Sequence, residues 1–220
     1  SHSIPLVSIT GSVSIGRYAA SKVAQRFGKT ILELGGNNAI IITPSADLKI
    51  AVPSVVFGAV GTCGQRCTST RRLIIHESVY DKVKNSLLSA YKSLQIGNPL
   101  NENNHLGPLI DKEAVNDFIS AIITIKEQGG KITYGGEILR GAGFESGCYV
   151  LPVIAEVFQE IPIVKEETFA PILYLIKYSG SIQNAVKIQN SVNQGLSSAI
   201  FSNDIRETEY FLSAEGSDCG

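Results

Sequence analysis

Apolar segments of strand length alternate with amphipathic segments of helix length from one end of this sequence to the other, and this alternation limits the fold more than any other feature. Residues 39–43 and 172–178 are predicted strands, and residues 181–192 are a predicted helix. Such a chain folds into a sheet that helices cover on both faces. We therefore predict an α/β domain with a mainly parallel, twisted sheet.

Cap and turn residues place the remaining elements. Further strands are predicted at residues 6–10, 30–34, 71–76, 131–134 and 198–201, and a last helix at 204–214. Asp47, Ser78 and Asp111 are predicted N-caps of three helices. Pro53 follows Asp47 late enough to kink the helix that it caps.

Two helices have a predicted packed face. The first follows a glycine turn at residues 11–16 and ends at Gly28, a usual place for a left-handed residue. Its inward residues are expected to be Ile15, Ala19, Val23 and Phe27. The helix after Asp111 is expected to pack through Val115, Phe118, Ile122 and Ile123.

Composition and charge exclude several classes of function. Of the 220 residues, 44% are hydrophobic and 18% are charged, so the chain can bury a substantial core. No apolar run approaches the ~20 residues that span a bilayer, and a net charge of -1 provides no basic field for nucleic acid or a membrane surface. The four cysteines, without a secretory leader, are expected to be reduced thiols of a cytoplasmic protein. Cys63 and Cys67 lack a second ligand pair, so no metal site is expected.

The stretch from Phe57 to Arg72 surrounds Cys67 with small and cationic residues. The glycines before the cysteine would let the backbone approach a ligand closely. Arg66, Arg71 and Arg72 flank the thiol, and a cationic neighbour favours the thiolate, which is the nucleophilic form of cysteine. The alternative is that Cys67 is a small buried hydrophobe, as many free cysteines are.

Three other stretches have a chemical interpretation and a structural alternative. Residues 10–16 turn from a strand into a helix, where backbone N–H groups can meet an anion, although a plain connection would look the same. Glu33 interrupts an apolar strand before two glycines, which suits either a general base or a structural ion pair. Residues 166–171 place two acids and an aromatic ring before a buried strand, as a capped turn also would.

Together these four stretches resemble motifs of the aldehyde dehydrogenase superfamily. ITGSVSIG resembles its phosphate-side element, LELGG its general-base motif, GQRC its nucleophile motif and EETFAP its cofactor motif, in the same order and with matching separation. The resemblance extends over essentially all 220 residues. ELGGNNAI, GQRCTSTRRL, GLSSAIF and the terminal GSDCG are most similar to the antiquitin branch, which oxidises α-aminoadipic semialdehyde.

The resemblance implies that the chain oxidises an aldehyde to a carboxylic acid with NAD, or with NADP, as cofactor. Cys67 would form a thiohemiacetal and then a thioester, and Glu33 would activate the water that hydrolyses the thioester. Glu167 would bind the nicotinamide ribose, and Phe169 would pack beside it. The cofactor would also be bound by Thr10, Gly11, Ser12 and Gly16.

Arg66, next to the proposed nucleophile, is a candidate substrate residue. Its guanidinium presents a rigid fork that suits a carboxylate, so it could hold the far end of a carboxylated aldehyde such as α-aminoadipic semialdehyde. The alternative is that Arg66 only lowers the pKa of the thiol or pairs with a structural acid.

The resemblance also implies that the chain is a fragment. Residues 1–32 would be the end of the NAD-binding domain, and residues 33–220 would be an incomplete catalytic domain without the upstream oxyanion-hole asparagine. The complete enzyme would form a homo-oligomer, whereas the fragment alone could be an inactive folding or assembly unit. A cysteine hydrolase is disfavoured because His2, His76 and His105 lie near none of the motifs.

Overall fold

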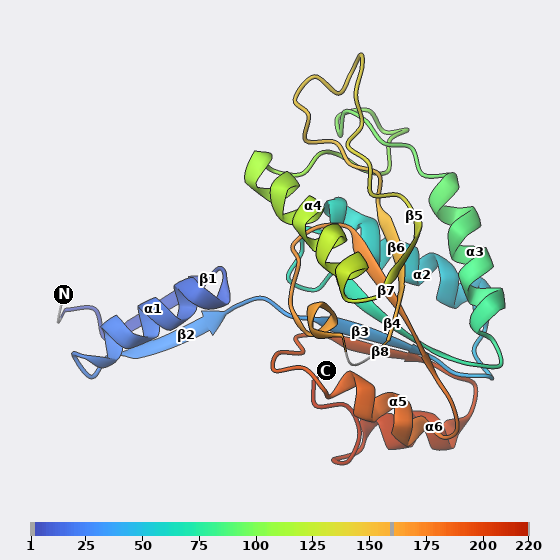
Figure 1. Ribbon diagram of the computed structural model, residues 1–220. Coiled ribbons are helices and arrows are strands. Elements are labelled where there is room, and N and C mark those ends of the chain that lie inside the picture. Colours follow the sequence, from blue (N-terminus) through green and yellow to red (C-terminus); the bar gives the residue numbers. More distant parts are fainter. Residues whose placement is uncertain (1–2, 159–160, 220) are drawn as a thin grey trace. The chain divides into compact units, whose positions relative to one another are not determined.

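The computed structural model describes residues 3–158 and 161–219, and Figure 1 shows the chain coloured along its sequence. His2 and Gly220, which belong to the sequence predictions, lie outside the described residues. The chain divides after Gly36 into two compact units. The assignment of residues 1–32 and 33–220 to two enzyme domains stays a prediction.

The first unit consists of two parallel strands joined by a helix. Its elements are β1 (Leu6–Thr10), α1 (Val13–Ala24) and β2 (Lys29–Glu33). Both strands are confirmed to within one residue, and the predicted glycine turn is shorter than expected because the helix already begins at Val13. Thr10 pairs with Glu33 in the register, so both residues end their strands at the same edge of the pair.

α1 packs through a narrow stripe of small residues. The buried residues of the helix are Gly16, Ala19 and Val23. The inward placement of Ile15 and Phe27 is wrong, because Ile15 is 55% exposed and Phe27, which is 98% exposed, lies beyond the end of the helix at Ala24. Gly28 is not the left-handed residue either, since α1 ends at Ala24 and Phe27 has a φ of 58°.

The second unit is built on one six-stranded sheet. Its strands are β3 (Asn38–Ile42), β4 (Thr70–His76), β5 (Lys131–Tyr134), β6 (Val153–Val157), β7 (Ile172–Tyr178) and β8 (Ser198–Phe201). They lie in the order β5-β6-β7-β4-β3-β8, and all neighbours are parallel except β5 and β6, which are antiparallel. The predicted α/β fold with a mainly parallel sheet is confirmed.

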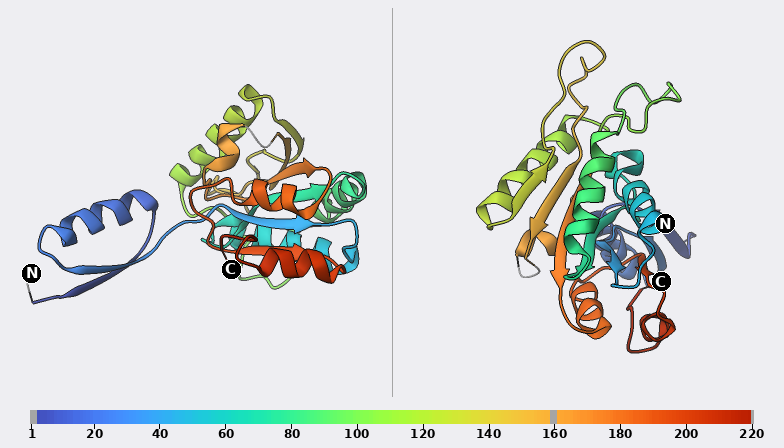
Figure 2. Two further views of the ribbon diagram at one scale, coloured as in Figure 1. Left: turned by 90° about the horizontal axis from the view of Figure 1, so that it is seen from below. Right: turned by 90° about the vertical axis from the view of Figure 1, so that its right-hand side faces the viewer.

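Helices cover both faces of this sheet. They are α2 (Leu48–Val60), α3 (Tyr80–Lys92), α4 (Lys112–Glu127), α5 (Ile182–Gln189) and α6 (Ile205–Leu212), with the 3₁₀ helices η1 (Gly61–Gly64) and η2 (Pro162–Lys165). α2 leads from β3 to β4, whereas α5 leads from β7 to β8 in the opposite direction along the sheet. Because such crossovers are right-handed, the two helices lie on opposite faces. Figure 1 shows α2 above β3 and α5 below it, and Figures 1 and 2 both show β6 and β7 between α3 and α4.

Two of the three predicted N-caps are confirmed. The carboxylates of Asp47 and Asp111 each accept a bond of 2.9 Å from a backbone N–H in the first turn of α2 and α4. The cap predicted at Ser78 is wrong, because its hydroxyl lies 2.8 Å from Nδ1 of His76 and α3 has no side-chain cap. Pro53 lies inside α2, which the structure describes as one helix.

The packed face of α4 is predicted correctly except at its edge. Val115, Phe118 and Ile122 are buried, whereas Ile123 is 51% exposed because it lies one residue further round the helix. Within residues 3–158 and 161–219, none of the helices combines the length and the apolar character that crossing a membrane requires.

Candidate active site

Cys67 lies in the segment that connects α2 with β4, which we call the cysteine loop (residues 61–69). Three successive residues of this loop, ending at Gly64, have φ between 53° and 67°, in the left-handed region. A Cβ on Gly64 would lie 2.5 Å from the carbonyl group of Ala170, in the segment that we call the acidic loop (residues 166–170). The two loops therefore pass against each other with no room for a side chain.

The four cysteines differ in their access to solvent. Cys67 is exposed and Cys219 is partly exposed, whereas Cys63 and Cys148 are buried. The alternative that Cys67 is a small buried hydrophobe is therefore wrong. Burial raises the pKa of Cys63 to about 12. In the described part of the chain, no group of three or more His, Cys, Asp or Glu side chains could hold a metal ion.

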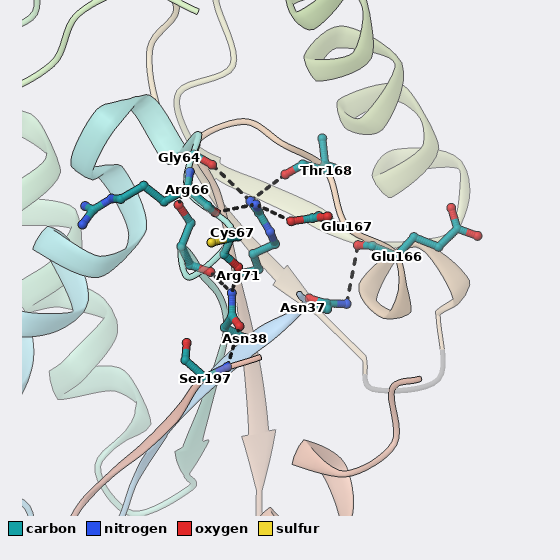
Figure 3. A network of polar contacts seen from close by, with 11 residues as sticks. Asn37, Asn38, Gly64, Arg66, Cys67, Arg71, Glu166, Glu167, Thr168 and Ser197 are labelled. Carbon is teal, nitrogen blue, oxygen red and sulfur yellow. Dashed lines mark hydrogen bonds and ion pairs between the residues drawn. The ribbon is translucent and has the colours of Figure 1, made fainter. Parts of the chain in front are cut away.

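The side-chain amide of Asn38 fixes the main chain of the cysteine loop (Figure 3). Its Nδ2 donates to the carbonyl oxygens of Cys67 and Ser69, both at 2.8 Å, and its Oδ1 accepts a bond of 2.9 Å from the backbone N–H of Ser197. Asn38 is only 2% exposed, and its bond to Ser69 is buried. Asn38 lies inside ELGGNNAI, one of the stretches most similar to the antiquitin branch, but no role is predicted for it from the sequence.

The guanidinium of Arg71 lies between the cysteine loop and the acidic loop (Figure 3). Its Nη1 donates to the carbonyl oxygens of Gly64 at 3.3 Å and Thr168 at 2.7 Å. Its Nη2 donates to the carbonyl oxygen of Arg66 at 3.3 Å and forms an ion pair with Oε1 of Glu167 at 3.0 Å. Burial lowers the pKa of Arg71, and the charge of Glu167 opposes this shift.

The next arginine, Arg72, points to a different part of the unit. Its guanidinium donates at 2.8 to 3.0 Å to the carbonyl oxygens of Asn37, Ile188 and Gln189. Burial lowers the pKa of Arg72 to about 10, and the charge of Asp218 opposes this shift. Neighbouring residues of a strand point to opposite faces, so Arg71 and Arg72 cannot both face the cysteine.

Arg66 precedes Cys67 in the sequence, but its guanidinium turns back toward the end of α2 (Figure 3). It donates to the carbonyl oxygens of Phe57 at 3.1 Å and Gly61 at 3.4 Å, and it lies 5.0 Å from the centre of the Phe57 ring. Arg66 also borders a cavity of about 630 Å³ that is lined mainly by apolar side chains of α2 and α3, with His105. The prediction that three arginines surround the thiol is therefore wrong.

The acidic loop presents its second acid, not its first, to Arg71. The side chain of Glu167 is 23% exposed, and the neighbouring residue Phe169 is 46% exposed, with its ring centre 5.4 Å from the guanidinium carbon of Arg71. The side chain of Glu166 points away from this cluster in Figure 3, and its carbonyl oxygen accepts a bond of 3.5 Å from Nδ2 of Asn37. Cys67, Arg71, Glu167 and Phe169 thus belong to one region of the second unit.

The remaining predicted site residues belong to the first unit. Thr10, Gly11 and Ser12 lie where β1 turns into α1. The N–H of Gly11 donates to the carbonyl oxygen of Glu33 at 3.1 Å, and Ser12 is the N-cap, with its hydroxyl accepting a bond of 3.3 Å from the N–H of Ile15. No acidic residue lies in the first turn of α1, which leaves the positive end of the helix dipole available to an anion.

Glu33 ends β2 with an exposed side chain. Among residues 3–158 and 161–219 no ion pair involves Glu33, so the structural ion-pair alternative finds no support there. Gly16, predicted to bind the cofactor, is buried inside α1, where an added Cβ would lie 2.5 Å from a methyl carbon of Leu34. The observed contact of Gly16 is therefore helix packing.

Known proteins are similar to this chain in sequence and in fold. Residues 1–220 match the aldehyde dehydrogenase family. Over 217 residues the chain is 50% identical to aldehyde dehydrogenase family 7 member B4 of Arabidopsis thaliana, covering 99% of this chain and 42% of the relative. It is 46% identical over 218 residues to α-aminoadipic semialdehyde dehydrogenase of Mus musculus, covering 99% of this chain and 40% of the relative. The predicted resemblance to the antiquitin branch is confirmed.

The fold is likewise similar to that of solved enzymes. Betaine aldehyde dehydrogenase from Staphylococcus aureus, crystallised in complex with NAD+, superposes with a TM-score of 0.91 and 29% identity, covering 94% of this chain and 41% of that chain. The chain thus spans less than half the length of the relatives that it matches. On its sequence and its fold, the chain belongs to the aldehyde dehydrogenase family.

Proposed function

We propose that the full-length protein oxidises an aldehyde to a carboxylic acid by covalent catalysis at Cys67. The observation that carries this proposal is an exposed thiol on a loop whose main chain is held by two buried side chains, Asn38 and Arg71. A nucleophile that is accessible and held in one position suits attack on a carbonyl carbon.

In the proposed reaction, the thiolate of Cys67 adds to the aldehyde carbon and forms a thiohemiacetal. NAD+, when bound, would accept the hydride that leaves the aldehyde carbon, so that a thioester would remain on Cys67. Glu33 then takes a proton from water, whose oxygen attacks the thioester carbon. The carboxylic acid leaves as the carbon–sulfur bond breaks, and the thiolate of Cys67 is regenerated.

Each unit, taken by itself, has residues that suit part of a dinucleotide. The partly exposed carboxylate of Glu167 can accept hydrogen bonds from ribose hydroxyls, and the half-exposed ring of Phe169 offers an aromatic surface beside it. In the first unit, the start of α1 after Thr10, Gly11 and Ser12 offers backbone N–H groups to a phosphate. Gly16 would support this phosphate site indirectly, because it packs α1 closely against Leu34.

For the substrate we propose α-aminoadipic semialdehyde or a related carboxylated aldehyde. Two relatives, from Mus musculus and Rattus norvegicus, are α-aminoadipic semialdehyde dehydrogenases. Arg66 is the proposed carboxylate-binding residue, because its half-buried guanidinium borders a cavity of about 630 Å³. Binding there requires the substrate carboxylate to compete with the carbonyl oxygens of Phe57 and Gly61.

The homo-oligomeric state and the cytoplasmic location stay predictions. The alternative that the 220-residue chain alone is an inactive folding unit is favoured by one observation, its coverage of less than half of each relative.

The test is NADH formation by the full-length protein with α-aminoadipic semialdehyde, compared with the 220-residue chain. We expect NADH from the full-length protein and none from its Cys67→Ser variant. Aldehyde-dependent NADH formation that survives Cys67→Ser would overturn the assignment of the nucleophile. Peptidase or esterase activity without NAD+ and no NADH formation would favour the cysteine hydrolase.

A further inference from the structure

The guanidinium of Arg71 joins two segments that are far apart in the sequence (Figure 3). In the cysteine loop it donates to the carbonyl oxygens of Gly64 and Arg66, both at 3.3 Å. In the acidic loop it donates to the carbonyl oxygen of Thr168 at 2.7 Å and to Oε1 of Glu167 at 3.0 Å. One planar group therefore holds the main chain near the thiol and the carboxylate proposed to bind ribose.

A steric contact links the same two loops. The backbone of Gly64 faces the carbonyl group of Ala170 so closely that a Cβ would lie 2.5 Å from it. The cysteine loop therefore cannot move toward the acidic loop, and the hydrogen bonds of Arg71 oppose movement away from it. The relative position of the loops is limited in both directions.

The chemistry of arginine suits this position. The Arg71 side chain is 2% exposed, and a buried charge is tolerated when it is paired and hydrogen-bonded. The guanidinium is a rigid fork that can address acceptors on two sides, whereas lysine offers one nitrogen on a flexible chain. Because Glu167 is partly exposed, its carboxylate can contact Arg71 and a ligand at the same time.

We propose that Arg71 is a positioning residue that couples cofactor binding to the geometry of the nucleophile. Arg71 orients the Glu167 carboxylate for the ribose hydroxyls, and the same guanidinium holds the loop that carries Cys67. A ligand that binds Glu167 therefore changes the geometry, and with it the reactivity, of the Cys67 thiol. This inference rests on the proposed function, because it takes Glu167 as a cofactor ligand.

The first test is a double-mutant cycle on NAD+ binding to the full-length protein, measured calorimetrically without aldehyde. Arg71→Lys is expected to raise the Kd for NAD+ about tenfold or more, the usual effect of losing a charge-assisted hydrogen bond. In a Glu167→Gln background the same substitution is expected to raise Kd by less than about threefold, because Arg71 acts through Glu167.

Arg72→Lys is the matched control, because Arg72 is equally buried but bonds the carbonyl oxygens of Asn37, Ile188 and Gln189. A merely structural effect would be the same in both backgrounds, as we expect for Arg72→Lys. A rise of less than twofold for Arg71→Lys, or an equal rise in the Glu167→Gln background, would overturn the proposal.

The second test leaves Arg71 unchanged, so it does not depend on whether an Arg71 variant folds. It measures the alkylation rate of Cys67 with and without saturating ADP-ribose, which has the ribose but no nicotinamide to shield the thiol. We expect ADP-ribose to change the rate in the wild type and to have no effect in Glu167→Gln, even at saturation. The same change in both proteins, or no change in the wild type, would contradict the coupling.

The two proposals fail in different ways. A wild-type protein that binds neither NAD+ nor ADP-ribose would overturn the proposed function and the coupling together. Normal binding and turnover with additive Arg71 and Glu167 effects would overturn the coupling alone.

Discussion

The side-chain amide of Asn38 donates to the carbonyl oxygen of Cys67 at 2.8 Å, so an amide at the start of β3 directly holds the residue that carries the thiol. The same nitrogen bonds the carbonyl oxygen of Ser69, and the amide oxygen accepts from Ser197. Three backbone groups thus depend on one buried side chain.

Asn38→Ala is expected to destabilise the protein by about 2–4 kcal/mol, because it removes three hydrogen bonds of a buried side chain, one of them to the buried Ser69. Urea unfolding followed by circular dichroism measures this change. The exposed Asn103→Ala is the control and is expected to change stability by less than about 0.5 kcal/mol. Equal effects of the two substitutions would show that the Asn38 bonds contribute little.

Cys67 is expected to be the first thiol alkylated by iodoacetamide near neutral pH. It is exposed, whereas Cys63 and Cys148 are buried, and burial raises the pKa of Cys63 to about 12, so that Cys63 stays a thiol at this pH. Peptide mass mapping after brief labelling measures the order. Earlier labelling of Cys148 or Cys219 would contradict the assignment.

Glu33→Gln in the full-length protein is expected to lower steady-state turnover by about 10²–10⁴, because loss of a positioned base slows attack of water on the thioester. Formation of the first equivalent of NADH should persist, since acylation precedes this step. Rapid-mixing absorbance separates the two phases. The exposed Glu113→Gln serves as the control, and unchanged turnover in Glu33→Gln would make Glu33 structural.

Arg66→Ala is expected to reduce kcat/KM for α-aminoadipic semialdehyde by about 2–3 kcal/mol of transition-state stabilisation, the value of a charge-assisted hydrogen bond. A simple aliphatic aldehyde should be affected much less. Steady-state kinetics with both substrates measure the difference, with the exposed Arg206→Ala as the control variant. Equal losses for both aldehydes would assign Arg66 to support of the loop through Phe57 and Gly61.

Gly64→Ala is expected to destabilise the protein by more than about 2 kcal/mol, because it combines a left-handed φ of 67° with a Cβ 2.5 Å from the Ala170 carbonyl. Gly129→Ala separates the two causes. Gly129 has a φ of 86° but no atom within 4 Å of an added Cβ, so only the backbone strain, about 1 kcal/mol, is expected there. Thermal unfolding of both variants measures the difference, and equal losses would show that the loops can separate.

The sequence predicts the regular elements well because their signals are local. Asp47 and Asp111 cap their helices as expected, since a carboxylate needs only the N–H groups of the next turn. The cap predicted at Ser78 is absent because the Ser78 hydroxyl hydrogen-bonds to His76, two residues before it, instead of to the helix. The inward placement of Phe27 is wrong because helical spacing does not show where a helix ends: α1 stops at Ala24, and Phe27 has a left-handed φ of 58°.

The candidate site is only partly visible in the sequence. Cys67, Glu33 and Glu167 belong to recognisable motifs, but the function of Asn38 depends on a bond to Ser197, 159 residues away. The different partners of Arg71 and Arg72 follow from the alternation of side chains along β4. The order of the strands in the sheet decides which loop lies beside each face of β4, and local sequence patterns do not contain that order.

The bond between Asn38 and Ser197 also has a consequence for how the protein acquires its site. Contacts between distant residues form late in folding, because the entropy of closing a long loop must be overcome first. On the ribosome, Cys67 is made well before Thr168 and Ser197, which lie 97 residues after Arg71 and 159 residues after Asn38. The growing chain therefore carries a cysteine loop without these hydrogen-bond partners until most of the second unit has been synthesised. The thiol of Cys67 is held in its final position only after the second unit has folded.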